Sequence, residues 1–251
     1  MVTISVIIPM YNEQKIVIDC AVSLIEELES AADFVSRYEI IFSDDGSSDG
    51  CGDMAAEFAS SARAGAMMSR GEIRVVRSDE NCGKGHAVRL GMLAAHGDIS
   101  VFTDCDLAYG ARAAVDIARE LAQSEDDVMI GSRAIHPDGY RGYTLLRKIA
   151  SKAYLRLLSV FAGLKFSDSQ CGLKAFRGSS AAQVFGLAET NGWAFDLELL
   201  MLSSGLGMRV GEYPVCVINH RESKVRLLRD SLRMVRDVVR IKRRVKSVLR
   251  G

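Results

Sequence analysis

Short runs of apolar, mostly β-branched residues alternate with amphipathic stretches along the first half of the chain. Turn-forming residues follow each run, and four runs have the length of buried strands: 4–9, 38–43, 73–77 and 99–103. The spacing of apolar positions predicts helices at about 14–29, 53–64, 86–96 and 111–123, with a further strand at 128–130. Strand and helix therefore alternate four times, which is typical of a parallel sheet with helices on both faces.

The second half is less regular. A polar loop followed by a short strand is expected within 166–176, the start of a helix at 193–202, and a strand at 208–217. Two basic amphipathic helices are expected, at 144–164 and from 225 onward. In the last helix one arc carries apolar residues, namely Val225, Leu228, Leu232, Val235, Val238 and Val239. Another arc carries arginines, namely Arg226, Arg229, Arg233, Arg236, Arg240, Arg243 and Arg244.

A polar cluster follows each of the four strands, at 9–13, 44–49, 81–85 and 104–106. Ligands of parallel sheets bind beyond the carboxyl ends of the strands, so the four clusters predict a nucleotide site at that edge. The Ser/Asp cluster at 44–49 also offers N-cap residues for the helix that follows it.

Asp104 and Asp106 end the fourth strand and are separated by one residue. Side chains alternate along an extended chain, so both carboxylates should point to the same side. Mg²⁺ is often held by one or two carboxylates together with substrate phosphates, and this pair suits it. The alternative is that both acids only form a turn.

Composition limits the class of protein. The 251 residues suit one large α/β domain or two small ones, and 48% hydrophobic residues allow a substantial core. No apolar run approaches the roughly 18 to 20 residues that span a bilayer, and no signal peptide is expected. Six scattered cysteines without metal-ligand spacing predict reduced thiols in a cytoplasmic protein.

The net charge of zero conceals a division between the two halves. Residues 1–130 hold 10 Lys and Arg against 23 Asp and Glu, whereas residues 131–251 hold 22 against nine. A basic second half indicates an acidic or phosphate-bearing partner, either a membrane or a nucleic acid.

Taken together, these motifs resemble inverting family 2 glycosyltransferases of the GT-A fold. The likeness rests on residues 7–13 (Ile-Ile-Pro-Met-Tyr-Asn-Glu), 43–49 (Ser-Asp-Asp-Gly-Ser-Ser-Asp), the 81–85 loop and 104–108 (Asp-Cys-Asp-Leu-Ala). Residues 168–174, 192–200 and 220–224 are similar to polyprenyl-phosphate glycosyltransferases, the dolichyl-phosphate β-glucosyltransferase type above all and mannose synthases next. The resemblance implies one GT-A catalytic domain at 1–224, with a nucleotide-sugar half (1–130) and an acceptor half (131–224), followed by a basic helix at 225–251.

The same resemblance implies a nucleotide-sugar donor, UDP-glucose before GDP-mannose, a Mg²⁺ or Mn²⁺ cofactor, and an inverting hexosyl transfer to a polyprenyl phosphate. Carried over by position, the donor would be bound by Pro9, Tyr11, Asn12, Glu13, Asp44, Asp45, Lys84, Asp104 and Asp106. Asp104 and Asp106 would hold the metal, and Asp106 and Asp196 are the catalytic candidates. The acceptor or its phosphate would be bound by Arg133, Gln170, Lys174, His220, Ser223 and Lys224.

Other interpretations of these residues stay open. Lys84 between two glycines suits phosphate binding, but an exposed loop lysine explains it about as well. Asp196 is expected to act as a general base, to position an already ionised phosphate acceptor, or to cap a helix. Ala108 and His220-Arg221 depart from the patterns of many relatives, so metal ligation would rest on the two aspartates, and phosphate contacts cannot be copied from the mannose synthases.

The two basic helices predict peripheral attachment to anionic lipid, since such helices lie in the headgroup region. Ordinary packing on the domain, or a homodimer, is the alternative. A family 2 enzyme with a soluble or polysaccharide acceptor is the second functional hypothesis. A nucleic-acid-binding module is the third, and it is disfavoured because no aromatic stacking cluster accompanies the arginines.

Overall fold

The structure is a computed structural model that describes residues 1–139, 166–192, 194–219 and 227–249. Predicted features at 144–164, Trp193 and the 220–226 segment lie outside these residues, and with them His220, Ser223 and Lys224. The side chains of 227–237 are likewise not described.

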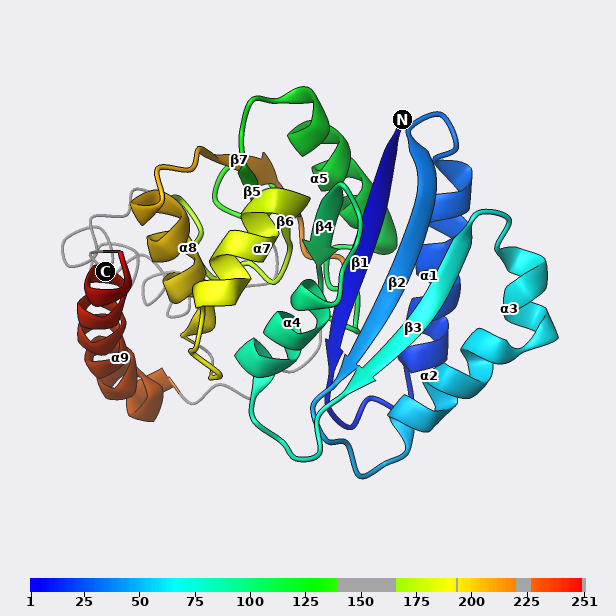
Figure 1. Cartoon of the computed structure of the whole chain (residues 1–251), viewed down its shortest axis with the longest axis horizontal. Coiled ribbons are helices and arrows are strands. Elements are labelled where there is room, and N and C mark those ends of the chain that lie inside the picture. The colour runs from blue at the N-terminus through cyan, green and yellow to red at the C-terminus, as the bar shows by residue number, and fades with distance from the viewer. Residues whose placement is uncertain (140–165, 193, 220–226, 250–251) are drawn as a thin grey trace.

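A seven-stranded sheet runs through the described part of the molecule, in the order β3-β2-β1-β4-β6-β5-β7 (Figure 1). Its strands are β1 (Val2–Met10), β2 (Val35–Asp44), β3 (Gly71–Arg77), β4 (Ile99–Phe102), β5 (Val128–Ser132), β6 (Lys174–Arg177) and β7 (Val210–Pro214). Within this sheet β6 alone is reversed, since it pairs antiparallel with both β4 and β5. The prediction of a mainly parallel sheet is therefore confirmed.

Helices cover both faces of the sheet, as predicted. One hydrophobic cluster packs α1 (Val17–Ser30), α2 (Cys51–Ser60), α3 (Ala62–Met67) and α5 (Ala111–Gln123) against β1 and β2. The other cluster lies on the opposite face and contains residues of α4 (Lys84–Leu93), α7 (Gly178–Leu187), α8 (Phe195–Gly205) and α9 (Leu227–Val248). Side chains alternate along a strand, so Ile7 and Ile41 face the second cluster whereas Ile8 and Phe42 face the first.

Three local expectations differ from the structure. The helix expected at 53–64 is two helices, α2 and α3, which are divided at Ser61. The N-cap of α2 is Gly50, so no side chain of the Ser/Asp cluster caps this helix. Asp49 Oδ1 nevertheless accepts a hydrogen bond from Cys51 N, in the first turn, at 3.0 Å. Helix α7 was not expected at all.

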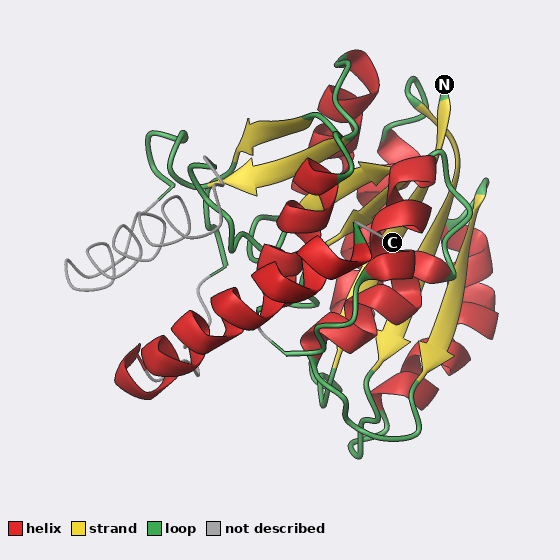
Figure 2. Ribbon diagram, turned by 60° about the vertical axis from the view of Figure 1, so that its left-hand side comes forward, coloured by secondary structure: helices red, strands yellow, loops and turns green. Residues whose placement is uncertain are grey.

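Helix α9 begins and ends close to the predicted residues. In the part whose side chains are described, however, the buried residues match the predicted apolar arc only in part. Val238, Ile241 and Val245 are buried in the cluster that contains α8, whereas Val239 is 39% exposed. Arg244 also points into the domain rather than lying on a solvated basic face. Figure 2 shows the carboxyl end of α9 against the body of the domain. The second half of this helix is therefore part of the domain core and not a separate unit.

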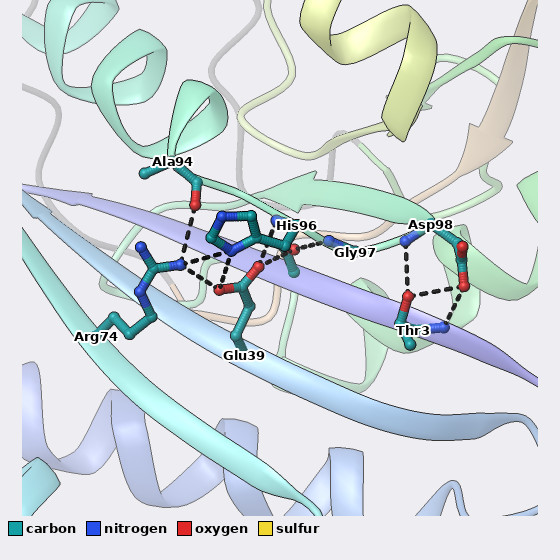
Figure 3. Close-up of polar contacts among 8 residues, drawn as sticks. Thr3, Glu39, Arg74, Ala94, His96, Gly97 and Asp98 are labelled. Carbon is teal, nitrogen blue, oxygen red and sulfur yellow. Dashed lines mark hydrogen bonds and ion pairs between the residues drawn. The ribbon is translucent and has the colours of Figure 1, made fainter.

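The connection from α4 to β4 is fixed by a polar network centred on Glu39 of β2 (Figure 3). The Glu39 carboxylate is buried and accepts hydrogen bonds from Ser5 Oγ, His96 N and Arg74 Nη1, each at 2.6 Å. Beside it, Asp98 Oδ2 accepts from Thr3 N at 2.8 Å. These contacts lie near the amino end of β4, at the opposite end from the polar clusters, so they set where β4 enters the sheet.

Candidate active site

Two of the predicted loops dock on each other beyond the ends of β1 and β2. Asn12 has a left-handed backbone (φ 56°), and its N donates to Ser47 Oγ at 3.0 Å. Its side-chain Oδ1 accepts from Ser48 N at 2.9 Å. Pro9 is buried at the end of β1, whereas Tyr11 is 48% exposed. Asn12 therefore joins the two loops, and the exposed Tyr11 ring beside it is accessible to a ligand.

Asp44 and Asp45 are both buried, and both hold backbone in place. Asp44 Oδ1 accepts from Ser47 N at 3.0 Å. Asp45 accepts from Cys82 N at 3.1 Å and from Gly83 N at 2.7 Å, so it fixes the third polar loop. Their predicted contacts with base and ribose stay a prediction.

Lys84, at the start of α4, reaches across to the Asp-x-Asp segment. Its Nζ lies 2.5 Å from Asp104 Oδ1. Burial would lower the pKa of Lys84, but the charges of Asp104, Asp196 and Asp106 raise it above its usual value. The ammonium therefore stays charged, and the alternative of a solvated loop lysine is wrong.

The Asp-x-Asp segment is a turn and not the end of an extended strand. Strand β4 ends at Phe102, Leu107 N donates to Asp104 O at 2.9 Å, and Leu107 has φ 46°. The prediction of an extended chain from Asp104 to Asp106, with alternating side chains, is therefore wrong. Asp104 faces Lys84, while Asp106 accepts from Ala108 N at 3.1 Å and lines a cavity of about 280 Å³ together with Asp19, Cys20 and Asn219.

Asp196 lies in the first turn of α8 and is buried beside Lys174. Lys174 Nζ lies 2.5 Å from Asp196 Oδ1 and also donates to Cys171 O at 2.7 Å. Burial raises the pKa of Asp196, although Lys174 and Lys84 act in the opposite direction. Lys174 has no exposed surface, so it holds Asp196 in place and is not itself accessible to an acceptor from solvent.

Arg133 follows β5 and forms a two-pronged ion pair with the buried Asp168. Arg133 Nε and Nη2 donate to the two carboxylate oxygens at 2.6 and 2.9 Å. Gln170, two residues after Asp168, is exposed. Its side chain thus remains accessible, whereas most of the Arg133 guanidinium is used to fix the loop before β6.

The acid pair suits a divalent cation in its chemistry. Carboxylate oxygens are hard ligands, and the Asp104 side chain is one-third exposed, although the Lys84 ammonium beside it would have to give way to the cation. No cluster of three or more His, Cys, Asp or Glu able to hold a metal occurs among the described residues. A cation here would therefore be shared between Asp104, Asp106 and a bound phosphate, as in many Mg²⁺ sites.

The structure gathers most of the described site candidates at one edge. Asp45 fixes the loop that carries Lys84, and Lys84 contacts Asp104. Asp196 contacts Lys174 and lies close enough to Lys84 for the two charges to affect each other's pKa. An ion pair between the buried Glu198 of α8 and Arg244 of α9 was not expected. A charged residue inside the apolar run 195–202 was the signal that could have indicated a buried ion pair at Glu198.

Comparison with known sequences identifies the family. Residues 5–185 match the family described as Glycosyl transferase family 2. The chain belongs to glycosyl transferase family 2. The prediction of a glycosyltransferase is confirmed.

Relatives of this family 2 enzyme include lipid-phosphate glucosyltransferases. The dolichyl-phosphate beta-glucosyltransferase of Drosophila melanogaster is 33% identical over 95% of this chain and 74% of its own length. The Saccharomyces cerevisiae enzyme of the same name is 28% identical, with the same coverage. Glycosyltransferase AglD of Haloferax volcanii is 33% identical over 95% of this chain, which spans only 37% of AglD.

Solved structures confirm the GT-A fold of this family 2 enzyme. Glucosyl-3-phosphoglycerate synthase from Mycobacterium tuberculosis, in complex with Mn²⁺, UDP and phosphoglyceric acid, aligns with a TM-score of 0.65 at 21% identity. The alignment covers 97% of this chain and 78% of that one. Among the described residues, no helix is both long enough and apolar enough to cross a bilayer.

Proposed function

We propose that this family 2 enzyme transfers a hexose from a nucleotide sugar to a polyprenyl phosphate, with inversion at the anomeric carbon. The favoured donor is UDP-glucose, with GDP-mannose second, and the cofactor is Mg²⁺ or Mn²⁺. The reaction would take place at the cytoplasmic face of a membrane to which the protein attaches peripherally. A homodimer is compatible with this arrangement, and nucleic acid has no part in it.

The observation that carries the proposal is the ion pair formed by Lys84 and Asp104. Asp196 lies near this pair, since its negative charge helps to raise the pKa of Lys84. The Lys84 ammonium would contact the diphosphate, and the partly exposed Asp104 carboxylate would contact its metal, both beyond the carboxyl ends of the strands. The names of the dolichyl-phosphate beta-glucosyltransferase relatives support glucose as the sugar and a lipid phosphate as the acceptor.

The chain's own residues would prepare the donor for departure of its diphosphate. Lys84 would shift from Asp104 to the leaving phosphate, where its charge offsets the developing negative charge. Gly83 and Gly85 on either side allow the turn that carries Lys84 to pack directly against the 190–191 backbone, which fixes where the ammonium is presented. A divalent cation held by Asp104 and Asp106 would supply further charge neutralisation when bound.

Asp196 would orient the acceptor rather than take a proton from it. A phosphate acceptor is already ionised near neutral pH, so it needs little deprotonation. Lys174 holds one oxygen of Asp196 and partly offsets its charge, which reduces repulsion of an incoming phosphate.

The test incubates the protein with Mg²⁺ or Mn²⁺, a polyprenyl phosphate and either UDP-[¹⁴C]glucose or GDP-[¹⁴C]mannose. Label that enters the chloroform phase with UDP-glucose is the expected result. Asp104→Asn should abolish this transfer, while Asp33→Asn, an exposed aspartate distant from the site, should leave it unchanged.

The second candidate, a soluble acceptor, is decided in the same assay. Phosphoglyceric acid is a bound component of the aligned synthase structure, so it serves as the water-soluble acceptor to compare. Label that stays in the aqueous phase as a sugar adduct of such an acceptor, with none in chloroform, would replace the lipid proposal.

A further inference from the structure

The turn that carries Lys84 is supported from behind by the loop between α7 and α8. Gly85 N donates to Asn191 O at 2.7 Å. A side chain at Gly83 would collide with Asn191 O, and one at Gly85 would collide with Thr190 O. Gly83 has φ 110°, a conformation that residues with a side chain rarely adopt. The two backbones therefore pack directly on each other, and any shift of 190–191 is transmitted to Lys84.

That supporting loop is in turn held by Glu198 of α8. Glu198 Oε2 accepts from Glu189 N at 3.0 Å and from Thr190 N at 2.7 Å. The Glu198 side chain has no exposed surface. A buried carboxylate needs a partner for its charge, and this one binds the loop backbone with one oxygen.

Arg244 of α9 supplies the partner charge. Its Nη1 pairs with Glu198 Oε1, its Nε donates to Glu189 Oε2 at 2.8 Å, and its Nη2 donates to Leu187 O at 2.6 Å. Burial would lower the pKa of Arg244, but the hydrogen bond with Glu189 and the charge of Glu198 raise it above its usual value. One guanidinium thus grips both the end of α7 and the start of the supporting loop.

We propose that Arg244 is a positioning residue for the donor site: through Glu198 and the 189–191 backbone, it sets where the Gly83–Gly85 turn presents Lys84. The distant helix α9 is thereby part of the machinery that binds the donor. The proposal rests on the proposed function only in assigning that turn to the diphosphate of the donor.

An arginine is needed because three acceptors lie around one group. Its planar fork reaches a carbonyl and two carboxylates together, whereas a lysine presents a single point charge. Arg244→Gln removes the positive charge and leaves the buried Glu198 carboxylate without its ion-pair partner. The carboxylate should then shift toward water, which weakens its hydrogen bond from Thr190 N. Arg244→Lys should keep the charge pairing and lose the carbonyl contact.

The test combines hydrogen exchange with nucleotide binding. In the ligand-free protein, deuterium uptake of the peptide spanning 81–90 should be faster in Arg244→Gln than in wild type. UDP affinity, measured calorimetrically with Mn²⁺ well below both melting temperatures, should fall about five- to tenfold, within the range of indirect coupling. Arg244→Lys should recover part of both losses.

Arg243→Gln is the matched control, since it removes the same charge from the exposed neighbouring position. It should change neither measurement. Unchanged uptake in the 81–90 peptide, or UDP affinity equal to wild type in Arg244→Gln, would overturn the positioning role. A third outcome separates the two proposals. If the 81–90 peptide exchanges faster in Arg244→Gln but the wild-type protein does not bind UDP, the link between Arg244 and the turn is supported and the proposed donor is refuted.

Discussion

At the scale of single residues, the site is an alternation of opposite charges. Lys84 lies against Asp104 and Lys174 against Asp196, so these two proposed functional carboxylates already have a cation beside them. Sequence motifs predicted Lys84, Asp104, Lys174 and Asp196 as site residues, but not which of them pair with each other. Pairing depends on tertiary contacts between α4, α8, β6 and the turn after β4, which residue spacing does not reveal.

The contact of Lys84 with Asp104 predicts competition between the lysine and a metal. The ammonium is charged throughout the neutral range because the pKa of Lys84 is raised. Lys84→Gln should therefore raise the Mn²⁺ affinity of the donor-free protein about tenfold, which corresponds to about 1.4 kcal/mol. Electron paramagnetic resonance of free Mn²⁺ measures this directly. UDP affinity should fall in the same variant.

Two further variants make this measurement specific. Lys84→Arg keeps the charge and should bind Mn²⁺ as wild type does. Lys246→Gln removes a positive charge from an exposed position on α9 and should also have no effect. Equal Mn²⁺ affinity in wild type and Lys84→Gln would show that the lysine does not compete with the cation.

At the scale of elements, hydrophobic periodicity was most accurate where one face is buried and the other solvated. Helix α5 has the predicted bounds, and its buried positions recur with helical spacing. Helix α8 is buried on nearly every side, so it shows no clear period, and only its start was expected. Helix α7 was missed, since it follows β6 directly and contains two glycines and two serines, which are weak helix formers.

The Glu39 network predicts a stability effect with a defined pH dependence. Burial would raise the pKa of Glu39, but hydrogen bonds from Ser5, His96 N and Arg74 hold it below its usual value. The ionised form is thus favoured in the folded protein, and its stabilisation is present at neutral pH and lost as the pH falls through the lowered pKa. Glu39→Gln should cost about 2 kcal/mol at pH 7, measured by urea unfolding.

The difference between the two proteins should shrink as the pH falls through the lowered pKa of Glu39, where the wild-type carboxylate takes up its proton. Glu72→Gln, on the neighbouring strand β3 and exposed, is the control and should change stability by less than about 0.5 kcal/mol. A cost for Glu39→Gln that stays constant down to pH 3 would contradict the role assigned to the charge.

At the scale of the whole molecule, composition indicated two halves of opposite charge, and the structure shows that they share one sheet. Strands β6 and β7 of the basic half lie on either side of β5, which ends the acidic half, and they belong to the same sheet as β1 to β4. Removing the whole segment after residue 224 would also remove Val238, Ile241 and Val245 from the core. Membrane attachment is therefore better tested by charge than by truncation.

Replacing Arg229, Arg233 and Arg236 with Gln should weaken co-sedimentation with phosphatidylserine-containing vesicles at least tenfold. Each basic residue near an anionic surface contributes about 1 kcal/mol. Vesicles of neutral lipid should bind wild type and variant equally weakly. Undiminished binding to anionic vesicles by the triple variant would exclude this part of the helix from attachment.

The reversal of β6 has a consequence for how acceptor preference can be engineered. Every other strand delivers the loop that follows it to the working edge, whereas β6 delivers the residues that precede it, from Asp168 to Leu173. Grafting those few residues from a relative with a different acceptor would alter one wall of the site without disturbing the loops that follow β1, β2 and β3. Insertions after Arg177, by contrast, would fall at the far end of the sheet, where helix α7 follows β6 without a connecting loop, and should cost stability.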